Sequence, residues 1–256
     1  MQGDGAIRGV IFDLGSTLIR FNGDWPEILQ ESSRVLTEHL EQVGFNLDGM
    51  TFSETLSNEI MESYQARETD WIERTTASLL SRVMARYGYA EVSDEVIERS
   101  MIIFYAVSEA RWEPMVGVYD VLDELLSRNL HLGLISNAGD EDNVHRLIDN
   151  AQLRSFFGPI LISAAEGIRK PNPRLFETVL EAWDIPSHQA VMVGDNLGAD
   201  ILGAQHVGMH QIWLTAQANT AQNQMHEGVI IPEVVADNIT EVPALIRHLS
   251  EAASET

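Results

Sequence analysis

The sequence contains no cysteine, and this absence excludes several kinds of site at once. Without thiols the chain cannot form disulfides, bind zinc or an iron–sulfur cluster through cysteine, or use a thiol as a nucleophile. The same absence says nothing about the redox compartment, because a chain without cysteine tolerates both reducing and oxidising surroundings.

Long hydrophobic segments are also missing. No stretch approaches the roughly 18 uninterrupted apolar residues of a membrane span. The N-terminus, with Asp4 and Arg8 around a short apolar run, lacks the pattern of a signal peptide. We therefore expect a cytoplasmic protein that does not bind membranes.

Basic residues are scarce: 16 Lys and Arg residues against 39 Asp and Glu residues give a formal net charge of -23. So acidic a surface repels a phosphate backbone, and we expect no nucleic-acid binding because no basic cluster offsets the charge. Lys170 is the only lysine in the chain. Its isolation suggests a specific role, whereas codon bias or adaptation to high salt would explain the scarcity of lysine without one.

The composition and the hydrophobic pattern predict an α/β fold. The chain has 256 residues, 45% of them hydrophobic, enough for a large buried core. Short apolar runs alternate with segments of helical periodicity, which predicts a doubly wound parallel sheet buried on both faces. We expect strands at Gly9–Phe12, His131–Ile135, Ile160–Ile162, Ala190–Val193, Gln211–Leu214 and, more weakly, Glu233–Val235, and helices at Val118–Arg128, Asn143–Asn150, Pro173–Ala182 and Asp200–His206.

More than a hundred residues separate the first two strands, far more than the dozen or so that a crossover helix needs. None of this segment has a strand pattern, so we expect an all-α cap domain, residues 22–112, inserted into an α/β core of residues 1–21 and 113–256. The Ala- and Gln-rich segment Thr215–Gln224 is expected to be a surface loop. The cap helices are expected at Trp25–Gln42, Ser53–Ala66, Trp71–Arg86 and Ser93–Glu109.

Polar residues end the apolar runs in a consistent way, and the carboxyl ends of strands are where an open α/β sheet binds ligands. Asp13 follows the first strand, Ser136 and Asn137 the second, Lys170 the third, and Asp195 the fourth. Carboxylates, a hydroxyl and an ammonium group suit Mg²⁺ together with a phosphoryl group. Each residue taken alone could equally be a helix cap, a turn residue or a solvated cation, but their convergence on one sheet edge argues against that explanation.

These segments resemble the motifs of the haloacid dehalogenase-like hydrolase superfamily, in the subgroup with a helical cap after the first strand. The resembling segments are GVIFDLGSTL at 9–18, LISN at 134–137, GIRKPNPRLF at 167–176 and VMVGDNLGAD at 191–200. The resemblance implies a Mg²⁺-dependent phosphatase that acts on a small phosphorylated metabolite through an aspartyl-phosphate. It also implies a role for each motif residue: Asp13 as nucleophile, Asp195 and the Gly15 carbonyl as further Mg²⁺ ligands beside Asp13, Ser136 and Asn137 as phosphoryl contacts, Lys170 as neutralising cation, and Asp200 and Asn196 as supporting residues.

One position departs from that family's pattern. Its phosphatases usually carry an acid–base aspartate two residues after the nucleophile, where this chain has Gly15. General acid–base help is worth roughly 10²–10⁴-fold, so we expect a slow enzyme on poor leaving groups. Two alternatives stay open: a phosphate- or Mg²⁺-binding module that has lost turnover, and a hydrolase of a carbon–halogen or carbon–phosphorus bond. The acidic fourth motif favours phosphoryl chemistry over dehalogenation, which does not need Mg²⁺.

Other signals in the sequence are weaker. The chain lacks the serine-hydrolase elbow, the P-loop and the dinucleotide-binding glycine motif. We expect a monomer or homodimer, and replacement of Lys170 by methionine is expected to impair phosphoryl binding while barely changing thermal stability. Six cap residues could face a substrate. Three of them, Arg67, Trp71 and Arg74, are favoured because they lie close together in the sequence. The other three are Trp25, Tyr64 and Trp112.

Overall fold

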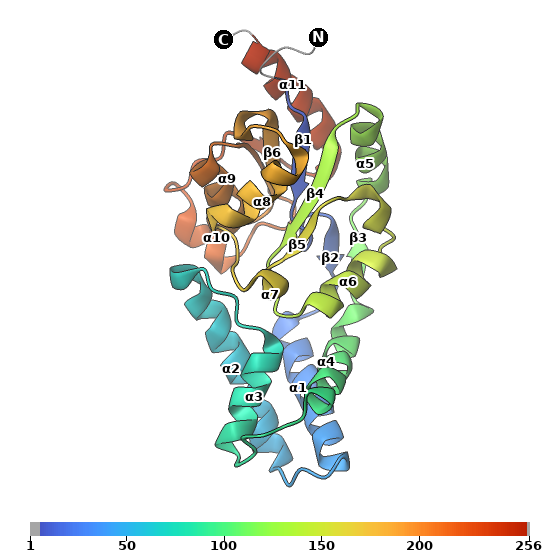
Figure 1. Ribbon diagram of the computed structural model, residues 1–256, viewed down its shortest axis with the longest axis vertical. Helices are drawn as coiled ribbons and strands as arrows, with labels where there is room; N and C mark the ends of the chain where they lie inside the picture. Colours follow the sequence, from blue (N-terminus) through green and yellow to red (C-terminus); the bar gives the residue numbers. More distant parts are fainter. Residues whose placement is uncertain (1–5, 255–256) are drawn as a thin grey trace.

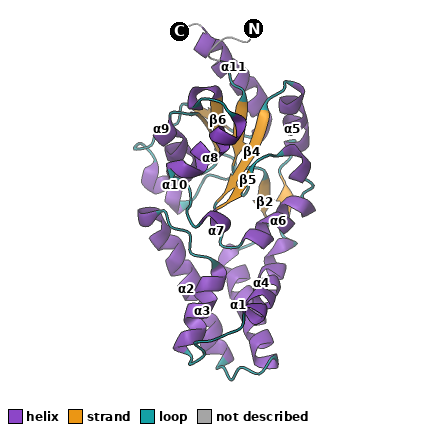
Figure 2. Cartoon of the chain, in the orientation of Figure 1, coloured by secondary structure: helices purple, strands orange, loops and turns teal. Residues whose placement is uncertain are grey.

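A six-stranded parallel sheet forms the centre of the larger half of the molecule (Figures 1 and 2). The computed structural model describes residues 6–254, apart from the side chains of residues 65–69 and 253–254. The strand order is β5-β4-β1-β6-β7-β8. The strands are β1 (Gly9–Phe12), β4 (His131–Ser136), β5 (Ile160–Ile162), β6 (Ala190–Gly194), β7 (His210–Leu214) and β8 (Val234–Ala236).

Helices cover both faces of the sheet, so the central strands are apolar on both sides. In β1, Val10 and Phe12 pack with one set of helices and Ile11 with the other. The first set is α5 (Val118–Ser127), α6 (Glu141–Asn150) and α11 (Val242–Ser254), and the second is α8 (Pro173–Trp183) and α9 (Leu202–Val207). Shorter helical segments are η1 (Arg154–Phe156), α7 (Ser163–Glu166), η2 (Ser187–Gln189), η3 (Leu197–Ile201) and η4 (Ile239–Glu241).

Four further helices form the lower half of the molecule in Figure 1, beyond the carboxyl ends of the strands. They are α1 (Trp25–Gln42), α2 (Gly49–Asp70), α3 (Thr76–Arg86) and α4 (Asp94–Glu109). Each begins where a side chain caps a free backbone N–H: Asp24, Asp48, Thr75 and Ser93. Their apolar faces form a hydrophobic cluster separate from the sheet, which includes Leu36, Leu40, Phe52, Leu56, Leu80, Val83 and Phe104.

These features confirm the predicted α/β fold with a helical cap. Within the described residues, none of the helices combines the length and the hydropathy needed to cross a bilayer. The strand at Gly9–Phe12, the strand at Ile160–Ile162 and the helix at Trp25–Gln42 have the expected bounds. The other expected elements of the core are present with ends that differ by a few residues.

Three expectations about the chain between and beyond the motifs were wrong. Two short strands, β2 (Ile19–Phe21) and β3 (Trp112–Pro114), pair antiparallel where the chain enters and leaves the cap. Three-residue strands are too short to give a recognisable period-two pattern, so the sequence did not predict them. A helix, α10 (Ala221–His226), begins within the expected loop after the Thr220 cap. The helix expected from Trp71 begins only at Thr76.

Candidate active site

Three carboxylates meet after the carboxyl ends of the strands. In Figure 1 this edge of the sheet faces the cap helices. Asp13 follows β1, Asp195 follows β6, and Asp200 lies in η3. Oxygen atoms of all three lie within 4.8 Å of one another. The structure therefore brings together the acidic residues of the first and fourth motifs, as their positions after neighbouring parallel strands predict.

Lys170 is buried beside this cluster and pairs with two of its three carboxylates. Its Nζ donates to Asp13 Oδ1 at 2.6 Å and to the Ile135 carbonyl at 2.7 Å, and it lies 2.7 Å from Asp200 Oδ1. Its side chain is 1% exposed. Lys170 thus joins residues from the first, second and fourth motifs by direct contacts.

This burial contradicts the expectation that methionine at position 170 would barely change stability. Removing one partner of a buried ion pair leaves the other charge without compensation, which typically costs about 3–5 kcal/mol. Here two carboxylates, Asp13 and Asp200, would lose their cation. The sequence could not show this, because an isolated lysine looks the same on the surface and in the interior.

Asp200 links the loop after β6 to Lys170. Its Oδ2 accepts the Asn196 N–H at 3.0 Å while its Oδ1 lies against Lys170. It sits in η3, a π-helical turn, and such turns are frequent at functional sites. Both carboxylate oxygens of Asp200 are thus engaged within the protein.

Asp195 is anchored through its backbone. Its carbonyl accepts from Trp213 Nε1 and from Asn223 Nδ2, both at 2.8 Å. Asn196, the residue expected to support the site, caps η3 by accepting the Ala199 N–H at 2.9 Å. Its side chain therefore shapes the loop, and Trp213 and Asn223 are supporting residues that the motifs did not reveal.

The charges in the cluster are unbalanced, because three carboxylates face one ammonium group. Burial raises the pKa of Asp13 to about 6, even though Lys170 opposes that shift. Burial and the nearby Asp13 also raise the pKa of Asp195 well above its ordinary value. Burial by itself would lower the pKa of Lys170, but Asp13 and Asp200 outweigh it and raise that pKa. The site therefore favours an additional positive charge.

The second-motif residues lie beside this cluster in different ways. Ser136 is the buried last residue of β4. The amide of Asn137 instead faces the backbone of Lys170: Lys170 N donates to Asn137 Oδ1 at 2.8 Å, and Asn137 Nδ2 donates to the Lys170 carbonyl at 3.0 Å. The Asn137 side chain thus joins the loop after β4 to the loop that carries Lys170.

Gly15 faces an indole ring. A Cβ atom built on this glycine would lie 3.4 Å from Cη2 of Trp112, on β3. The backbone of Gly15 is not in the left-handed region, which is taken by its neighbour Ser16, with φ of 62°. Thr17, for which the sequence suggested no role, has a fully buried hydroxyl without a hydrogen-bond partner among the described residues.

The cap residues expected to face a substrate lie in different surroundings. Arg74 pairs with Asp70 on the cap, and Tyr64 packs against the cap core. Trp25 contacts Phe21 with ring centroids 5.3 Å apart, and Trp71 lies against His206 of the core at 5.7 Å. The side chain of Arg67 lies outside the described residues. Of these residues, Trp112 has its ring against a motif residue.

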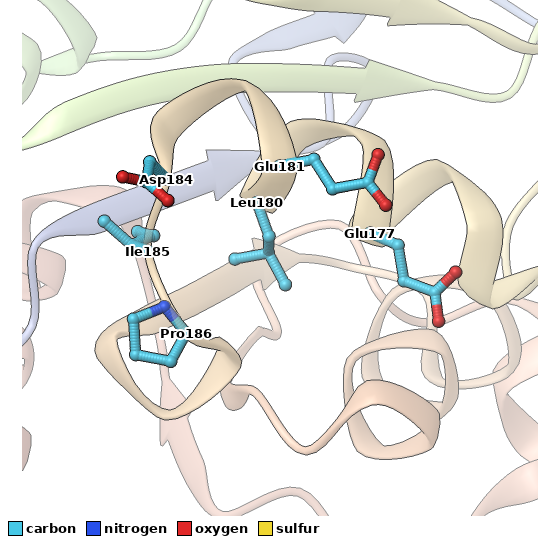
Figure 3. Close-up of a pocket in the computed structure, with 6 residues that line it drawn as sticks. All are labelled: Glu177, Leu180, Glu181, Asp184, Ile185 and Pro186. Carbon is cyan, nitrogen blue, oxygen red and sulfur yellow. The ribbon is translucent and has the colours of Figure 1, made fainter.

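An open depression lies on the surface away from the carboxylate cluster (Figure 3). It lies at the end of α8 and encloses about 520 Å³. Its lining contains none of the motif residues: Glu177, Leu180, Glu181, Asp184, Ile185 and Pro186. The chemistry is therefore expected at the carboxylate cluster rather than in this depression.

Comparison with known proteins agrees with the arrangement of the motifs. The model of the haloacid dehalogenase-like hydrolase family matches residues 7–208. The chain belongs to this family. It is 28% identical over 207 residues to a glyceraldehyde 3-phosphate phosphatase of Pyrococcus abyssi, a match that covers 81% of each chain.

Solved structures show the same fold. A 2-haloacid dehalogenase from Pseudomonas syringae pv. Tomato superposes with a TM-score of 0.67 and 24% identity, over 94% of this chain and 99% of that one. A phosphatase of the family from Thermococcus onnurineus superposes with a TM-score of 0.61 and 17% identity, over 94% and 98% of the two chains. Because both dehalogenases and phosphatases share this fold, the choice between their chemistries depends on the site.

Proposed function

We propose that this hydrolase is a Mg²⁺-dependent phosphatase of small phosphorylated metabolites, with Asp13 as the nucleophile. The observation that carries the proposal is the surplus of buried negative charge: carboxylate oxygens of Asp13, Asp195 and Asp200 lie within 4.8 Å of one another, and the ammonium of Lys170 pairs with Asp13 and Asp200. A site for haloacids would have to bind an anion beside these carboxylates without a compensating metal. The phosphatase relative from Pyrococcus abyssi supports the same choice.

The residues present fit a magnesium ion. Mg²⁺ prefers one or two carboxylates, waters and substrate phosphate oxygens. Asp13 and Asp195 would hold it, with the Gly15 carbonyl as the third protein ligand. When bound, the ion supplies charge neutralisation for the carboxylates and the phosphoryl oxygens.

The chain's own residues account for the nucleophilic step. Lys170 binds one oxygen of Asp13 at 2.6 Å and so fixes the orientation of the carboxylate. The ionised carboxylate attacks phosphorus and an aspartyl-phosphate forms. The bond to the leaving oxygen breaks, and that oxygen departs with the bonding electrons as an anion that takes its proton from solvent. Lys170 and the hydroxyl of Ser136 stabilise the negative charge on the phosphoryl oxygens. Water then attacks phosphorus, the bond between Asp13 and phosphorus breaks, and phosphate leaves while a proton of the water passes to solvent, which restores the Asp13 carboxylate. The cap, residues 22–112, excludes bulk water from the site.

Gly15 limits which leaving groups depart easily. It provides no carboxylate to protonate the leaving oxygen, and the Trp112 ring occupies the adjacent space. We therefore propose that aryl and acyl phosphates, whose leaving groups need little proton assistance, react faster than alkyl phosphates.

A substrate screen tests this function directly. Purified protein is assayed against phosphorylated metabolites, p-nitrophenyl phosphate and 2-haloacids, each with Mg²⁺ and with excess chelator, beside Asp13→Asn as the control. We expect Mg²⁺-dependent phosphate release by the parent and none by the variant. Dehalogenation that persists in chelator, or phosphate binding without turnover on any substrate, would replace the phosphatase by one of the alternatives.

A further inference from the structure

The segment between α2 and α3 runs against the loop that precedes Lys170. Arg169 N donates to the Trp71 carbonyl at 3.0 Å, and Glu73 N donates to the Gly167 carbonyl at 3.1 Å. Ile72 and Ile168 form an antiparallel bridge between them. Trp71 has left-handed backbone, with φ of 54°, which is uncommon for a bulky residue. We call residues 71–73 the cap latch, because this part of the cap is hydrogen-bonded to a catalytic loop.

Glu73, the last residue of the cap latch, has its side chain in the protein interior. Its side chain is fully buried, and its Oε2 accepts from Arg169 Nη1 at 3.0 Å and from Ser163 Oγ at 2.7 Å. A buried carboxylate is costly unless it is paired and hydrogen-bonded, so these two partners hold Glu73 in one position. Ser163 begins α7, which lies at the boundary between the sheet and the cap helices (Figure 1).

The two partners of Glu73 lead to the two loops that carry Ser136 and Lys170. Ser163 Oγ accepts the Ala138 N–H at 2.9 Å, two residues after Ser136. Arg169 directly precedes Lys170, and the Asn137 amide joins both loops through its two hydrogen bonds to the Lys170 backbone. The second and third motifs are thus one hydrogen-bonded network, and Glu73 is its link to the cap.

We propose that Glu73 is a positioning residue for hydrolysis: from the cap, it holds the loops of Ser136 and Lys170 in their catalytic arrangement through Ser163 and Arg169. Its carboxylate acts through these two neighbours. The proposal rests on the proposed function for its kinetic consequence, whereas the positioning of the loops can be measured without any substrate.

The test compares Glu73→Gln with Glu59→Gln. Glu59 is also a nearly buried cap glutamate, but its partners Arg82 and Arg86 lie in the same cap. With p-nitrophenyl phosphate and saturating Mg²⁺, we expect kcat of Glu73→Gln to fall at least 10-fold while KM changes less than threefold. We expect Glu59→Gln to stay within twofold of the parent in both parameters. Equal losses in the two variants would reduce Glu73 to a stabilising residue of the cap.

Hydrogen exchange supplies the readout that needs no activity. At a temperature well below unfolding, Glu73→Gln should speed amide exchange at least 10-fold in residues 136–139 and 163–170, whereas Glu59→Gln should affect only the cap helices. Unchanged exchange in these loops overturns the proposal, and so does faster exchange with an unchanged kcat.

Two further outcomes are provided for: a parent without activity and a Glu73→Gln variant that does not fold. If the parent releases no phosphate from any substrate, the proposed function fails and exchange alone decides the positioning of the loops. If Glu73→Gln does not fold, Arg169→Gln removes the same ion pair from the core side and must produce the same loosening of residues 136–139. Normal exchange there in Arg169→Gln would overturn the proposal.

Discussion

Gly194 and Asp200 approach each other so closely that only glycine fits at position 194: a Cβ atom there would stand 2.3 Å from Asp200 Cγ. Gly194 ends β6, and Asp200 returns from η3 to lie over it. The glycine therefore creates the space in which Asp200 reaches Lys170. This contact makes the last position of a central strand part of the site, although glycine has no functional group.

Gly194→Ala should displace Asp200 from Lys170. We expect a loss of about 1–3 kcal/mol in the free energy of unfolding, because overpacking forces local shifts, and a fall in kcat of at least 10-fold. Urea unfolding and steady-state kinetics measure the two effects. Gly49→Ala is the control, since its Cβ would meet only the flexible side chain of Glu41. Parent-like activity in Gly194→Ala would show that Asp200 need not occupy this position.

Lys170→Met should unfold more easily than the parent as well as lose activity. Without Mg²⁺, removing the ammonium leaves Asp13 and Asp200 buried without a cation, which typically costs about 3–5 kcal/mol. Denaturant unfolding in chelator measures this loss, and added Mg²⁺ should recover part of it. Lys170→Arg serves as the control of charge: its planar group retains the charge but not the shape, so stability should recover more than kcat. Unchanged stability of Lys170→Met in chelator would contradict the buried ion pairs.

Asp195→Asn should stabilise the metal-free protein at high pH. Burial and Asp13 raise the folded-state pKa of Asp195, so the folded protein binds a proton more tightly than the unfolded chain. Stability is therefore lost as pH rises through that raised pKa, and the asparagine removes the loss. We expect the melting temperature of the variant in chelator to exceed that of the parent at pH 8 and the difference to shrink toward pH 4.

Magnesium should reverse this order. A ligand that binds only the folded state stabilises it by mass action, and the parent has the Asp195 carboxylate for Mg²⁺ whereas the variant does not. At pH 8, titration with Mg²⁺ should raise the melting temperature of the parent well above its value in chelator and move that of Asp195→Asn much less. Equal Mg²⁺-induced shifts would remove Asp195 from the metal site.

The sequence predicted those parts of the molecule that follow from local pattern. Continuous apolar runs predicted the strands, and the rule that ligands bind at their carboxyl ends predicted that Asp13 and Asp195 meet. It could not predict contacts that depend on how separate segments pack. The motif predicts that Asn137 contacts a phosphoryl group, and the folded chain adds that its side-chain amide is hydrogen-bonded to the Lys170 backbone.

The cap was harder to interpret for the same reason. The pattern from Trp71 onward suits a helix, yet Trp71 adopts left-handed backbone and Glu73 turns into the core to meet Arg169. A buried glutamate cannot be told from a solvated one by its neighbours in sequence, because its partner lies 96 residues away. Tertiary contacts overrode local helical preference here.

Gly15→Asp should restore the missing acid. A positive φ at position 15 would strain an aspartate, but Gly15 does not have one. The residue with positive φ in this loop is Ser16, so the backbone at position 15 accepts a side chain. The remaining obstacle is the Trp112 ring, which lies 3.4 Å from the new Cβ atom, an ordinary contact distance. We expect hydrolysis of an alkyl phosphate to rise by up to roughly 10²-fold and that of p-nitrophenyl phosphate to change little, because acid assistance contributes most where the departing oxygen is most basic.

Gly15→Asn distinguishes the effect of the carboxyl proton from the effect of side-chain size. It presents the same size to Trp112 but cannot donate a carboxyl proton, so it should show no gain on the alkyl phosphate. Mg²⁺ affinity and circular dichroism of both variants confirm that the loop after Asp13 is intact before rates are compared. Equal gains in the two variants would assign the effect to packing against Trp112. A folded, Mg²⁺-binding Gly15→Asp with no gain, or a parent that already hydrolyses alkyl phosphates as fast as aryl ones, would mean that another group protonates the leaving oxygen.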